Sequence, residues 1–274
     1  MPNNTPSASP TFGTYYPSLL QRLTLKISRI PPLYRGSLRP AWVKLLNFFR
    51  KGPVDVNSNY GNFRVYPTTN LVDSAILLHP YYNKEELDFL QEDMPATGTF
   101  VDIGANIGLY SVAIGRNLNS GGHVVSIEPN PTCLERLSAN IQLNNLNIVK
   151  IFGVGVGDFN GKGRLVILKN DLAIAHIVRD DAEGTFKVRP LIDIIKEAGL
   201  NKIDALKIDV EGFEKAALEP FFRSADRALW PKRICMEHLH DNNEVTEILR
   251  KCGYRLIKNT RNNSLLLLGD QVAQ

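Results

Sequence analysis

The sequence lacks the features that define several common classes of protein. Three cysteines in 274 residues, all far apart, exclude a disulfide framework and a cysteine-based zinc site, so we expect a reducing compartment. No apolar run approaches the roughly 20 residues that span a bilayer, and the first twenty residues do not have the pattern of a secretory signal. These absences predict a cytoplasmic protein, and the length suits one large domain.

Acidic residues are absent from the first 54 positions, which carry eight Lys or Arg. The remainder of the chain holds 24 basic and 28 acidic residues, so a basic arm of charge +8 precedes a body of charge −4. We expect an arm of this charge, residues 1–54, to be attracted to an anionic partner such as a membrane surface. The alternative is a solvated, partly disordered leader whose charge only aids solubility.

Two short basic helices are predicted within the arm, over residues 19–30 and 41–50, after a lead-in at 1–18 that we expect to be disordered. One face of the second helix carries Trp42, Leu45, Leu46 and Phe49. This face has two interpretations: it packs against the body, or it enters a membrane interface while Lys and Arg meet lipid phosphates. Packing is favoured, and peripheral contact with an anionic membrane stays open.

An alternation of strands and helices fills residues 99–270 and predicts the fold class, which is α/β. Strands are predicted at 99–103, 123–127, 148–156, 205–210 and 233–236, and helices at 107–118, 131–144, 191–198, 213–222 and 243–252. Such alternation implies a parallel, doubly wound sheet with right-handed crossovers. Strands at 254–258 and 264–268 form a C-terminal antiparallel hairpin, which gives a mostly parallel sheet of seven strands.

Two segments lie outside this alternation. In a lead-in over 55–98, β-favouring runs from 63 to 79 predict a small β element, and 84–94 predicts a helix. After the third strand, the turn signal Asn160-Gly161 predicts an extra strand at 162–169. Residues 170–186 are then predicted to form an irregular loop, which is a candidate lid over a binding site.

The clearest motif is FVDIGANIG, residues 100–108, in which a strand enters a glycine turn and then a helix. Gly104 would let the backbone approach a ligand, and Gly108 would let the helix pack near the strand. Asn106 would cap the helix. The spacing differs from the G-x-G-x-x-G that houses a dinucleotide pyrophosphate, and suits a ligand end without phosphates, such as the amino-acid end of S-adenosylmethionine.

Acidic residues follow the next two predicted strands. Glu128 stands at the carboxyl end of the second strand, where a carboxylate can accept both hydroxyls of a ribose. Asp158 follows the third strand and has two equal interpretations, as an acceptor for an adenine amino group or as a turn residue beside Asn160. An adenosine-type ligand is therefore predicted at this edge of the sheet.

The fourth and fifth strands also end in ionisable side chains. Asp209 and Glu211 follow the fourth strand, and Glu237 and His238 follow the fifth, at the edge where doubly wound folds bind ligands. His238 and His240 beside these acids raise the question of a metal ion. No third ligand has suitable spacing, so no metal site is predicted.

Three motifs in order, VDIGANIGLYS, IEPNP and LKIDVEGFE, together resemble the FkbM-family methyltransferases over about residues 97–240. The resemblance implies a class I methyltransferase (Rossmann-like) fold, S-adenosyl-L-methionine as cofactor, and O-methylation of a hydroxyl on a sugar, glycan, polyketide or related metabolite. It also implies the cofactor contacts: Asp102, Gly104, Asn106 and Gly108 at the methionine end, Glu128 at the ribose and Asp158 at the adenine.

Methylation of a hydroxyl needs a group that receives its proton. The candidates are Glu211, Glu237, Asp209 and His238. The first two rank ahead because they follow adjacent strands and could flank one acceptor.

Two alternative functions remain: a nicotinamide-dependent oxidoreductase, disfavoured because G-x-G-x-x-G is absent, and a methyltransferase-like binding protein without turnover. A nucleic-acid acceptor is not expected, because the fourth strand does not end in the Asn/Asp-Pro-Pro-Tyr/Phe signature of amino-group methylation.

Overall fold

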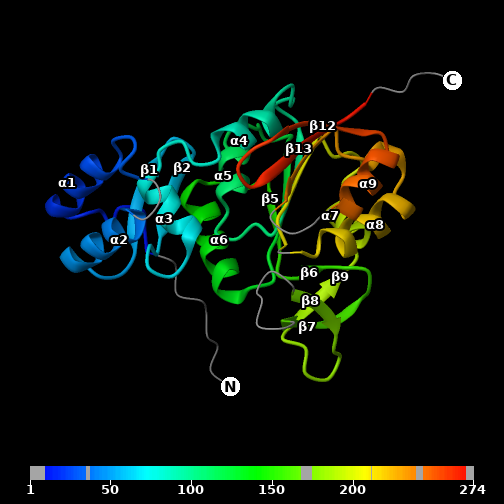
Figure 1. The fold of residues 1–274 in the computed structure, drawn as a ribbon, viewed down its shortest axis with the longest axis horizontal. Coiled ribbons are helices and arrows are strands. Elements are labelled where there is room, and N and C mark those ends of the chain that lie inside the picture. The colour runs from blue at the N-terminus through cyan, green and yellow to red at the C-terminus, as the bar shows by residue number, and fades with distance from the viewer. Residues whose placement is uncertain (1–9, 35–37, 168–174, 211, 239–242, 270–274) are drawn as a thin grey trace.

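The computed structural model describes residues 10–34, 38–167, 175–210, 212–238 and 243–269. A seven-stranded main sheet occupies the middle of the molecule, and two N-terminal helices lie at one end (Figure 1). A four-stranded sheet, which we call the second sheet, stands apart from the main one. No helix in these ranges is long and apolar enough to cross a bilayer.

The main sheet has the strand order β12-β13-β11-β10-β3-β4-β5. Its strands are β3 Thr99–Ile103, β4 His123–Ile127, β5 Val149–Phe152, β10 Ala205–Ile208, β11 Arg233–Glu237, β12 Tyr254–Asn259 and β13 Asn263–Leu268. Every pairing is parallel except those of β13, which runs antiparallel to both of its neighbours. The predicted α/β class, the seven strands and the terminal hairpin are confirmed.

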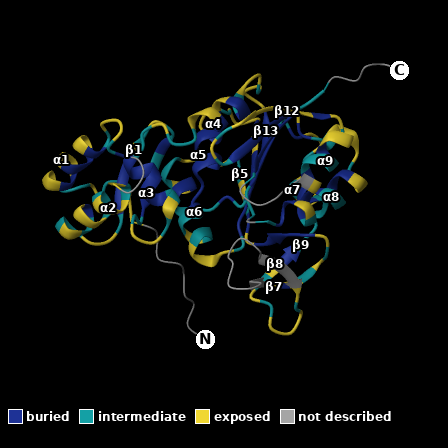
Figure 2. Cartoon of the chain, in the orientation of Figure 1, coloured by how far each residue is buried: buried dark blue, intermediate teal, exposed yellow. Residues whose placement is uncertain are grey.

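Helices cover both faces of this sheet, which explains why its central strands are largely apolar without alternation. One face packs against α4 Lys84–Gln91, α5 Leu109–Gly115 and α6 Pro131–Leu143, and the other against α7 Leu191–Ala198, α8 Glu214–Ser224 and α9 Asn243–Lys251. Neighbouring residues divide between the two cores: Phe100 belongs to the first and Val101 to the second. The central strands β3, β10 and β11 are accordingly buried along their length (Figure 2), whereas the edge strand β12 is exposed beyond Tyr254.

The lead-in contains a hairpin, β1 Val54–Ser58 and β2 Gly61–Val65, followed by helix α3 Leu71–Leu78. The prediction of β structure up to residue 79 was therefore wrong beyond Val65. Asn70 caps α3 by accepting the Val72 backbone N–H at 2.8 Å, and every residue from 73 to 78 is buried. A short helix buried on all sides lacks the 3.6-residue periodicity that marks an amphipathic helix, so its apolar run resembles a strand.

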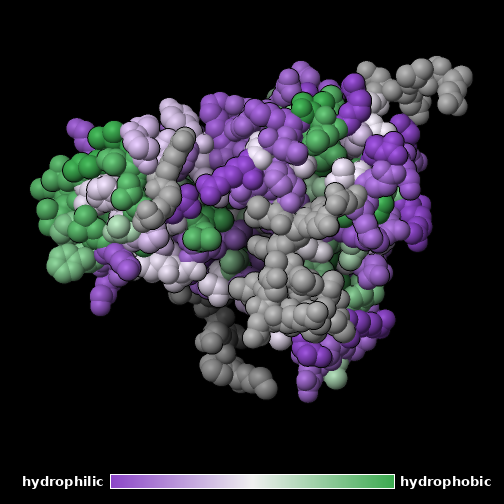
Figure 3. Space-filling model, in the orientation of Figure 1, coloured by the Kyte–Doolittle hydropathy of each residue, from purple (hydrophilic) through white to green (hydrophobic). Residues whose placement is uncertain are grey.

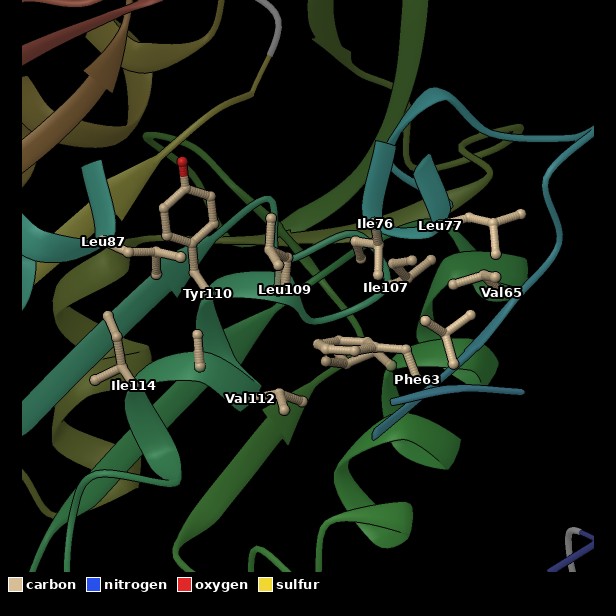
Figure 4. Packing of buried hydrophobic residues seen from close by; sticks show 14 of the residues in the cluster. Phe63, Val65, Ile76, Leu77, Leu87, Ile107, Leu109, Tyr110, Val112 and Ile114 are labelled. Atoms are coloured by element: carbon tan, nitrogen blue, oxygen red, sulfur yellow. The ribbon is translucent and has the colours of Figure 1, made fainter. Parts of the chain in front are cut away.

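This N-terminal layer joins the main domain through packing and hydrogen bonds. Figure 4 shows Phe63 and Ile76 meeting Ile107 and Val112 between the lead-in and α5. Asn140 of α6 adds a polar link, because its Oδ1 accepts the backbone N–H of Arg64 at 2.8 Å. The predicted division of the chain at residues 54 and 98 stays a prediction.

The arm forms the two predicted helices, α1 Leu19–Ser28 and α2 Leu38–Phe49, which pack together against α3. Leu46 is buried, and Trp42 packs against the core while its Nε1 donates to the Leu33 carbonyl at 2.9 Å. Arg29 donates twice to the Leu77 carbonyl of α3, at 2.9 and 3.2 Å. Of the predicted face of α2, Trp42 and Leu46 therefore pack inward, as favoured from the sequence, whereas Leu45 is 37% exposed.

A buried ion pair fixes residues 10–18, the described part of the N-terminal segment 1–18 that we expected to be disordered. Asp55 accepts from Arg64 at 2.8 and 3.1 Å, and from the backbone N–H groups of Gly13 and Tyr15 at 2.8 and 3.0 Å. Arg64 also donates to the carbonyls of residues 10 and 11. The expectation of disorder was wrong for residues 10–18, and residues 1–9 lie outside the described part.

We predict that Asp55→Asn destabilises the protein by about 3–5 kcal/mol at pH 7, because it leaves the buried Arg64 guanidinium unpaired. Burial raises the Asp55 pKa, but the Arg64 side chain and the backbone donors together lower it by more. The pKa therefore lies below its ordinary value of 3.8. A depressed folded-state pKa gives stability that is present above about 3.8 and lost as the pH falls through the folded value. The difference from wild type in urea unfolding should therefore shrink in acid.

The control for this variant is Asp88→Asn, which removes an exposed carboxylate paired with Lys84 on α4. It should change stability little, because exposed pairs contribute little. Hydrogen exchange of the Gly13 and Tyr15 amides should speed up only in Asp55→Asn. Unchanged protection of these two amides would contradict the role assigned to Asp55.

The second sheet replaces the irregular loop that the sequence predicted. It comprises β6 Gly155–Val156, β7 Gly161–Ile167, β8 Ala175–Arg179 and β9 Phe186–Arg189, in the order β6-β9-β7-β8. The extra strand after Asn160-Gly161 is confirmed, but the loop prediction for 170–186 was wrong at β8 and at Phe186. The predicted strand 148–156 divides into β5 and β6, which belong to different sheets. Part of the candidate lid, residues 168–174, lies outside the described residues.

Candidate functional site

The ionisable residues singled out in the sequence follow strands that are neighbours in the main sheet. β11, β10, β3 and β4 lie side by side and parallel, so their carboxyl ends meet at one edge. Glu237 ends β11, Asp209 follows β10, Gly104 follows β3 and Glu128 follows β4. This edge is where doubly wound folds bind ligands, and it is the candidate site.

The glycine turn after β3 is fixed by contacts on both sides. Gly104 has a φ of +75°, and its N–H donates to the Ile127 carbonyl of β4 at 2.9 Å. A Cβ at this position would stand 1.9 Å from the Asp209 carbonyl oxygen. Glycine is therefore needed at position 104 because the backbone that follows β10 comes close. The close approach of a ligand that the motif predicts at Gly104 stays a prediction.

Asn106 and Gly108 of the same motif differ in part from their predicted roles. Asn106 does not cap α5: the residue before that helix is Gly108, at φ +90°, and it has no side-chain cap. Asn106 instead takes a left-handed φ of 51°, donates its N–H to Glu128 Oε2 at 2.8 Å and accepts from Asn70. Gly108 allows close packing, but against Leu137 of α6, which a Cβ would meet at 2.6 Å.

Glu128 is buried and aimed by backbone donors. Its Oε2 accepts from Asn106 and its Oε1 accepts from the N–H of Asn130, both at 2.8 Å. Burial raises the pKa of Glu128 despite these two donors. Each carboxylate oxygen retains a further lone pair, so the group can accept two hydroxyl hydrogen bonds from a ribose.

A buried charged cluster lies just below the strand ends. Asp102 of β3 stands opposite Lys207 of β10 in the sheet register, and Lys207 Nζ contacts Asp209 Oδ2 at 2.6 Å. Burial lowers the Lys207 pKa, but Asp209 and Asp102 raise it more, so the pKa lies above its ordinary value. Burial raises the pKa of Asp102, although Lys207 opposes the shift. Lys207 was not predicted; the signal for it is a charge inside the apolar strand Leu206–Ile208.

Asp102 also has capacity for a ligand. Its Oδ2 accepts from the N–H and Oγ of Ser111 at 3.1 and 2.6 Å, whereas its Oδ1 has no hydrogen-bond partner among the described residues. A buried carboxylate oxygen of this kind suits an ammonium group. Asp102 therefore fits the amino-acid end of S-adenosylmethionine as Glu128 fits its ribose.

Glu214 is a second residue that the sequence did not nominate. It begins α8, is fully buried, and its Oε1 accepts from the backbone N–H groups of Val210 and Gly212 at 3.2 and 3.4 Å. Burial raises its pKa. Glu214 thereby holds the backbone at positions 210 and 212. Glu211, a predicted catalytic candidate, lies outside the described residues.

Glu237 and His238 lie against the terminal hairpin. Glu237 is 7% exposed and pairs with Asn263 of β13 in the sheet register. His238 donates its backbone N–H to the Asn262 carbonyl at 2.9 Å, and its Nδ1 lies 3.4 Å from Ser264 Oγ. The Asp209 carboxylate is more exposed to solvent than that of Glu237, with a side chain 36% exposed.

Asp158, unlike these residues, does not follow directly on a strand of the main sheet. β5 ends at Phe152, and Gly155–Val156 pairs with β9 of the second sheet, so the strand that was predicted to deliver Asp158 to the edge ends earlier. The side chain is exposed. Its role at the adenine stays a prediction, without the support of a strand end.

Within the described ranges, no three His, Cys, Asp or Glu side chains group as metal ligands.

The order of the seven strands, with a single reversed strand, defines the class I fold of S-adenosylmethionine-dependent methyltransferases. Residues 102–256 match the family model described as the Methyltransferase FkbM domain. Because the match covers more than half of the chain, this protein belongs to the FkbM methyltransferase family, and S-adenosylmethionine is its cofactor. The resemblance drawn from the three motifs is confirmed.

Individual proteins that this chain resembles share only about a quarter of its residues over the aligned regions. The chain is 26% identical over 196 residues to "Methyltransferase sdnD" of Sordaria araneosa, covering 56% of this chain and 75% of that protein. It is 25% identical over 211 residues to "AMB antimetabolite synthetase AmbE" of Pseudomonas aeruginosa, covering 60% of this chain and 10% of that protein.

Among solved structures, the chain is similar to methyltransferase FkbM of Methylobacillus flagellatus, at 19% identity and a TM-score of 0.42. The similarity covers 72% of this chain and 54% of that one, so the chain spans about half the length of the Methylobacillus protein.

Proposed function

We propose that this protein transfers a methyl group from S-adenosylmethionine to a hydroxyl oxygen of a sugar, glycan, polyketide or related small molecule. The observation that carries the proposal is the placement of Asp209 and Glu237 at the ends of adjacent strands, beside the Gly104 turn. Membership of a methyltransferase family argues against a nicotinamide-dependent oxidoreductase. A binding protein without turnover remains the alternative that the experiment below tests.

The bound cofactor supplies an electrophilic methyl group, and the chain must orient the acceptor and remove its proton. We assign the orienting role to Asp209, because the Lys207 ammonium holds one of its oxygens in place. We assign proton acceptance to Glu237, which ends the neighbouring strand and is mostly shielded from water. Glu211 and His238 stay candidates for the same step. A general base contributes about 10²–10⁴-fold to a rate.

Glu237→Gln should lower single-turnover methyl transfer at least about tenfold while leaving cofactor affinity nearly unchanged, because the amide keeps the shape and loses the basicity. The measurement is transfer of labelled methyl to acceptors screened by class, with cofactor affinity from calorimetry. Glu128→Ala is the complementary variant. It should weaken the cofactor by on the order of 1.5–3 kcal/mol through loss of hydrogen bonds to a charged group.

These two variants, together with Glu211→Gln, separate the possible failures. Wild-type turnover in Glu237→Gln and Glu211→Gln would refute carboxylate base catalysis at these positions. Cofactor binding by wild type with no transfer to any acceptor class would favour the binding-protein alternative. Equal cofactor affinity of wild type and Glu128→Ala would remove Glu128 from the site.

We also propose that the enzyme works in peripheral contact with an anionic membrane, as the charge of the arm predicts. The side of α2 predicted for this contact has Trp42 and Leu46 turned toward the protein. The contact therefore requires another face of the arm.

A further inference from the structure

Helix α1 is amphipathic in the opposite sense to an ordinary surface helix. Its buried side is largely polar: Gln21, Thr24 and Ser28 are 1%, 6% and 0% exposed. Its solvent side is apolar, with exposed fractions of 65% for Leu19, 52% for Leu20, 52% for Leu23 and 50% for Ile27. A helix of a soluble protein normally turns its apolar stripe toward the core, so this face calls for a partner.

Specific hydrogen bonds hold α1 in this rotation. Ser18 and Gln21 form a reciprocal capping box at the start of the helix. Gln21 Nε2 also donates to the backbone carbonyls of Leu46 and Arg50, at 3.0 and 3.3 Å. Rolling the helix to bury the leucines would break the two bonds from Gln21 Nε2 and leave a buried amide without partners. The outward apolar face is therefore built into the packing of the arm.

The apolar face continues beyond α1. Ile30 follows the helix at 54% exposed, and Leu38, Leu45 and Phe48 of α2 are 43%, 37% and 81% exposed. Figure 3 shows hydrophobic side chains gathered over the end of the molecule where Figure 1 places α1 and α2. We call the α1 part of this surface, Leu19, Leu20, Leu23 and Ile27, the outer face.

Only cations border the outer face within the arm. Arg22, Lys26 and Arg29 follow one another along α1 at intervals of four and three residues, which forms a basic stripe beside the apolar one. They line a cavity of about 430 Å³ next to the helix. Asp55 also lines this cavity, but its charge is balanced by Arg64. A phosphate-bearing headgroup suits such a border.

We propose that the outer face enters the interface of an anionic lipid bilayer, with its leucines and Ile27 among the acyl chains and Arg22 and Lys26 at the lipid phosphates. This inference rests on the proposed membrane contact and is independent of methyl transfer. Apolar side chains flanked by Lys and Arg are the pattern of helices that lie in a membrane interface. A second copy docked on the same face would bring the two basic stripes together, which disfavours it.

The test is co-sedimentation of the full chain with vesicles of phosphatidylcholine alone and of phosphatidylcholine with 30% phosphatidylglycerol, chosen as about one anionic lipid in three. Wild type should partition onto the anionic vesicles, and Leu23→Gln/Ile27→Gln should reduce this at least about tenfold, because apolar burial drives insertion. Arg22→Gln/Lys26→Gln should weaken binding to anionic vesicles and reduce its dependence on salt.

The matched control is Leu256→Gln/Ile257→Gln, a pair on β12 with exposed fractions of 49% and 52%. It should bind like wild type. Absence of wild-type binding at low salt would overturn the membrane contact and this inference together. Wild-type binding that the Leu23/Ile27 variant retains would leave the contact standing and overturn the assignment to α1. A wild-type dimer that this variant dissolves, without vesicle binding, would make a second copy the occupant.

Discussion

Gly104→Ala is expected to abolish cofactor binding, with at least about a hundredfold loss of affinity, and to destabilise the fold by several kcal/mol. The new methyl group would lie 1.9 Å from the Asp209 carbonyl oxygen, so the turn after β3 and the segment after β10 could not both keep their positions. The left-handed backbone at φ +75° adds about 1–2 kcal/mol of strain for any residue other than glycine. Calorimetry with S-adenosylmethionine and urea unfolding measure the two effects.

Gly199→Ala separates the clash from the backbone strain. Gly199 follows α7 with a φ of +78°, and a Cβ there would meet nothing within 4 Å. The control should therefore show only the strain of about 1–2 kcal/mol and retain wild-type cofactor affinity. Similar losses of stability in both variants would mean that the Asp209 backbone can move away from the new methyl group at little cost, which would contradict the predicted clash. Retained cofactor binding in Gly104→Ala would remove this turn from the site.

Lys207→Met should destabilise the protein by about 3–5 kcal/mol at pH 8, the scale on which removal of one partner breaks a buried ion pair. The Lys207 side chain is 4% exposed, and its ammonium compensates Asp209 at 2.6 Å and the buried Asp102 across the sheet. Methionine matches the apolar stem of lysine as far as the ε position and lacks only the ammonium, so the loss would chiefly reflect charge. Equilibrium unfolding in urea, compared with wild type, gives the value.

The pH dependence of this loss has a defined sign. Burial already holds the Asp102 pKa above its ordinary value, and without Lys207 only the hydrogen bonds from Ser111 oppose that shift. A carboxylate with a raised folded-state pKa stabilises the fold at low pH, and that stability is lost as the pH rises through the folded value. The cost of Lys207→Met should therefore be smaller at pH 5 than at pH 8.

Lys202→Met is the control, because Lys202 pairs with Asp204 near the start of β10 and its side chain is 47% exposed. It should change stability by only about 0–1 kcal/mol. A loss in Lys207→Met as small as in this control, at both pH values, would contradict a charge-compensating role for the buried lysine.

The parts of the fold that could be predicted are those encoded locally. Apolar runs of four to six residues between helical segments identify the strands of a sheet buried on both faces, since such strands need no alternation. The terminal hairpin was predictable because two β-favouring runs flank a short polar turn, residues 260–263. Acids at the strand ends were predictable because parallel strands bring their carboxyl ends together.

The parts that could not be predicted depend on partners distant in sequence. The requirement for glycine at position 104 comes from Asp209, 105 residues later, and no local pattern contains that contact. Lys207 resembles an interruption of an apolar strand until the register places it opposite Asp102. β8 and β9 are short, and they become strands through pairing with β7 on both of its edges.

The lead-in of the arm shows the same limit. Residues 10–18 have the composition of a disordered segment, and Asp55 gives no sign in the sequence that it will bind Gly13 and Tyr15. The helix α1 was predicted, but its rotation was not. That rotation depends on Gln21 reaching the end of α2, a contact across 25 residues.

The second sheet has a consequence for how the chain can be altered. Its first and last strands, β6 and β9, are paired neighbours, so the chain leaves the main domain and returns to it at nearly the same point. The segment between Asp158 and Phe186 is thus a cassette whose size the seven-stranded sheet does not set. The entropy of closing a loop grows slowly with its length, so insertions or exchanges there should leave the cofactor edge intact. Related enzymes could diversify, or be engineered, by replacing this cassette as one unit.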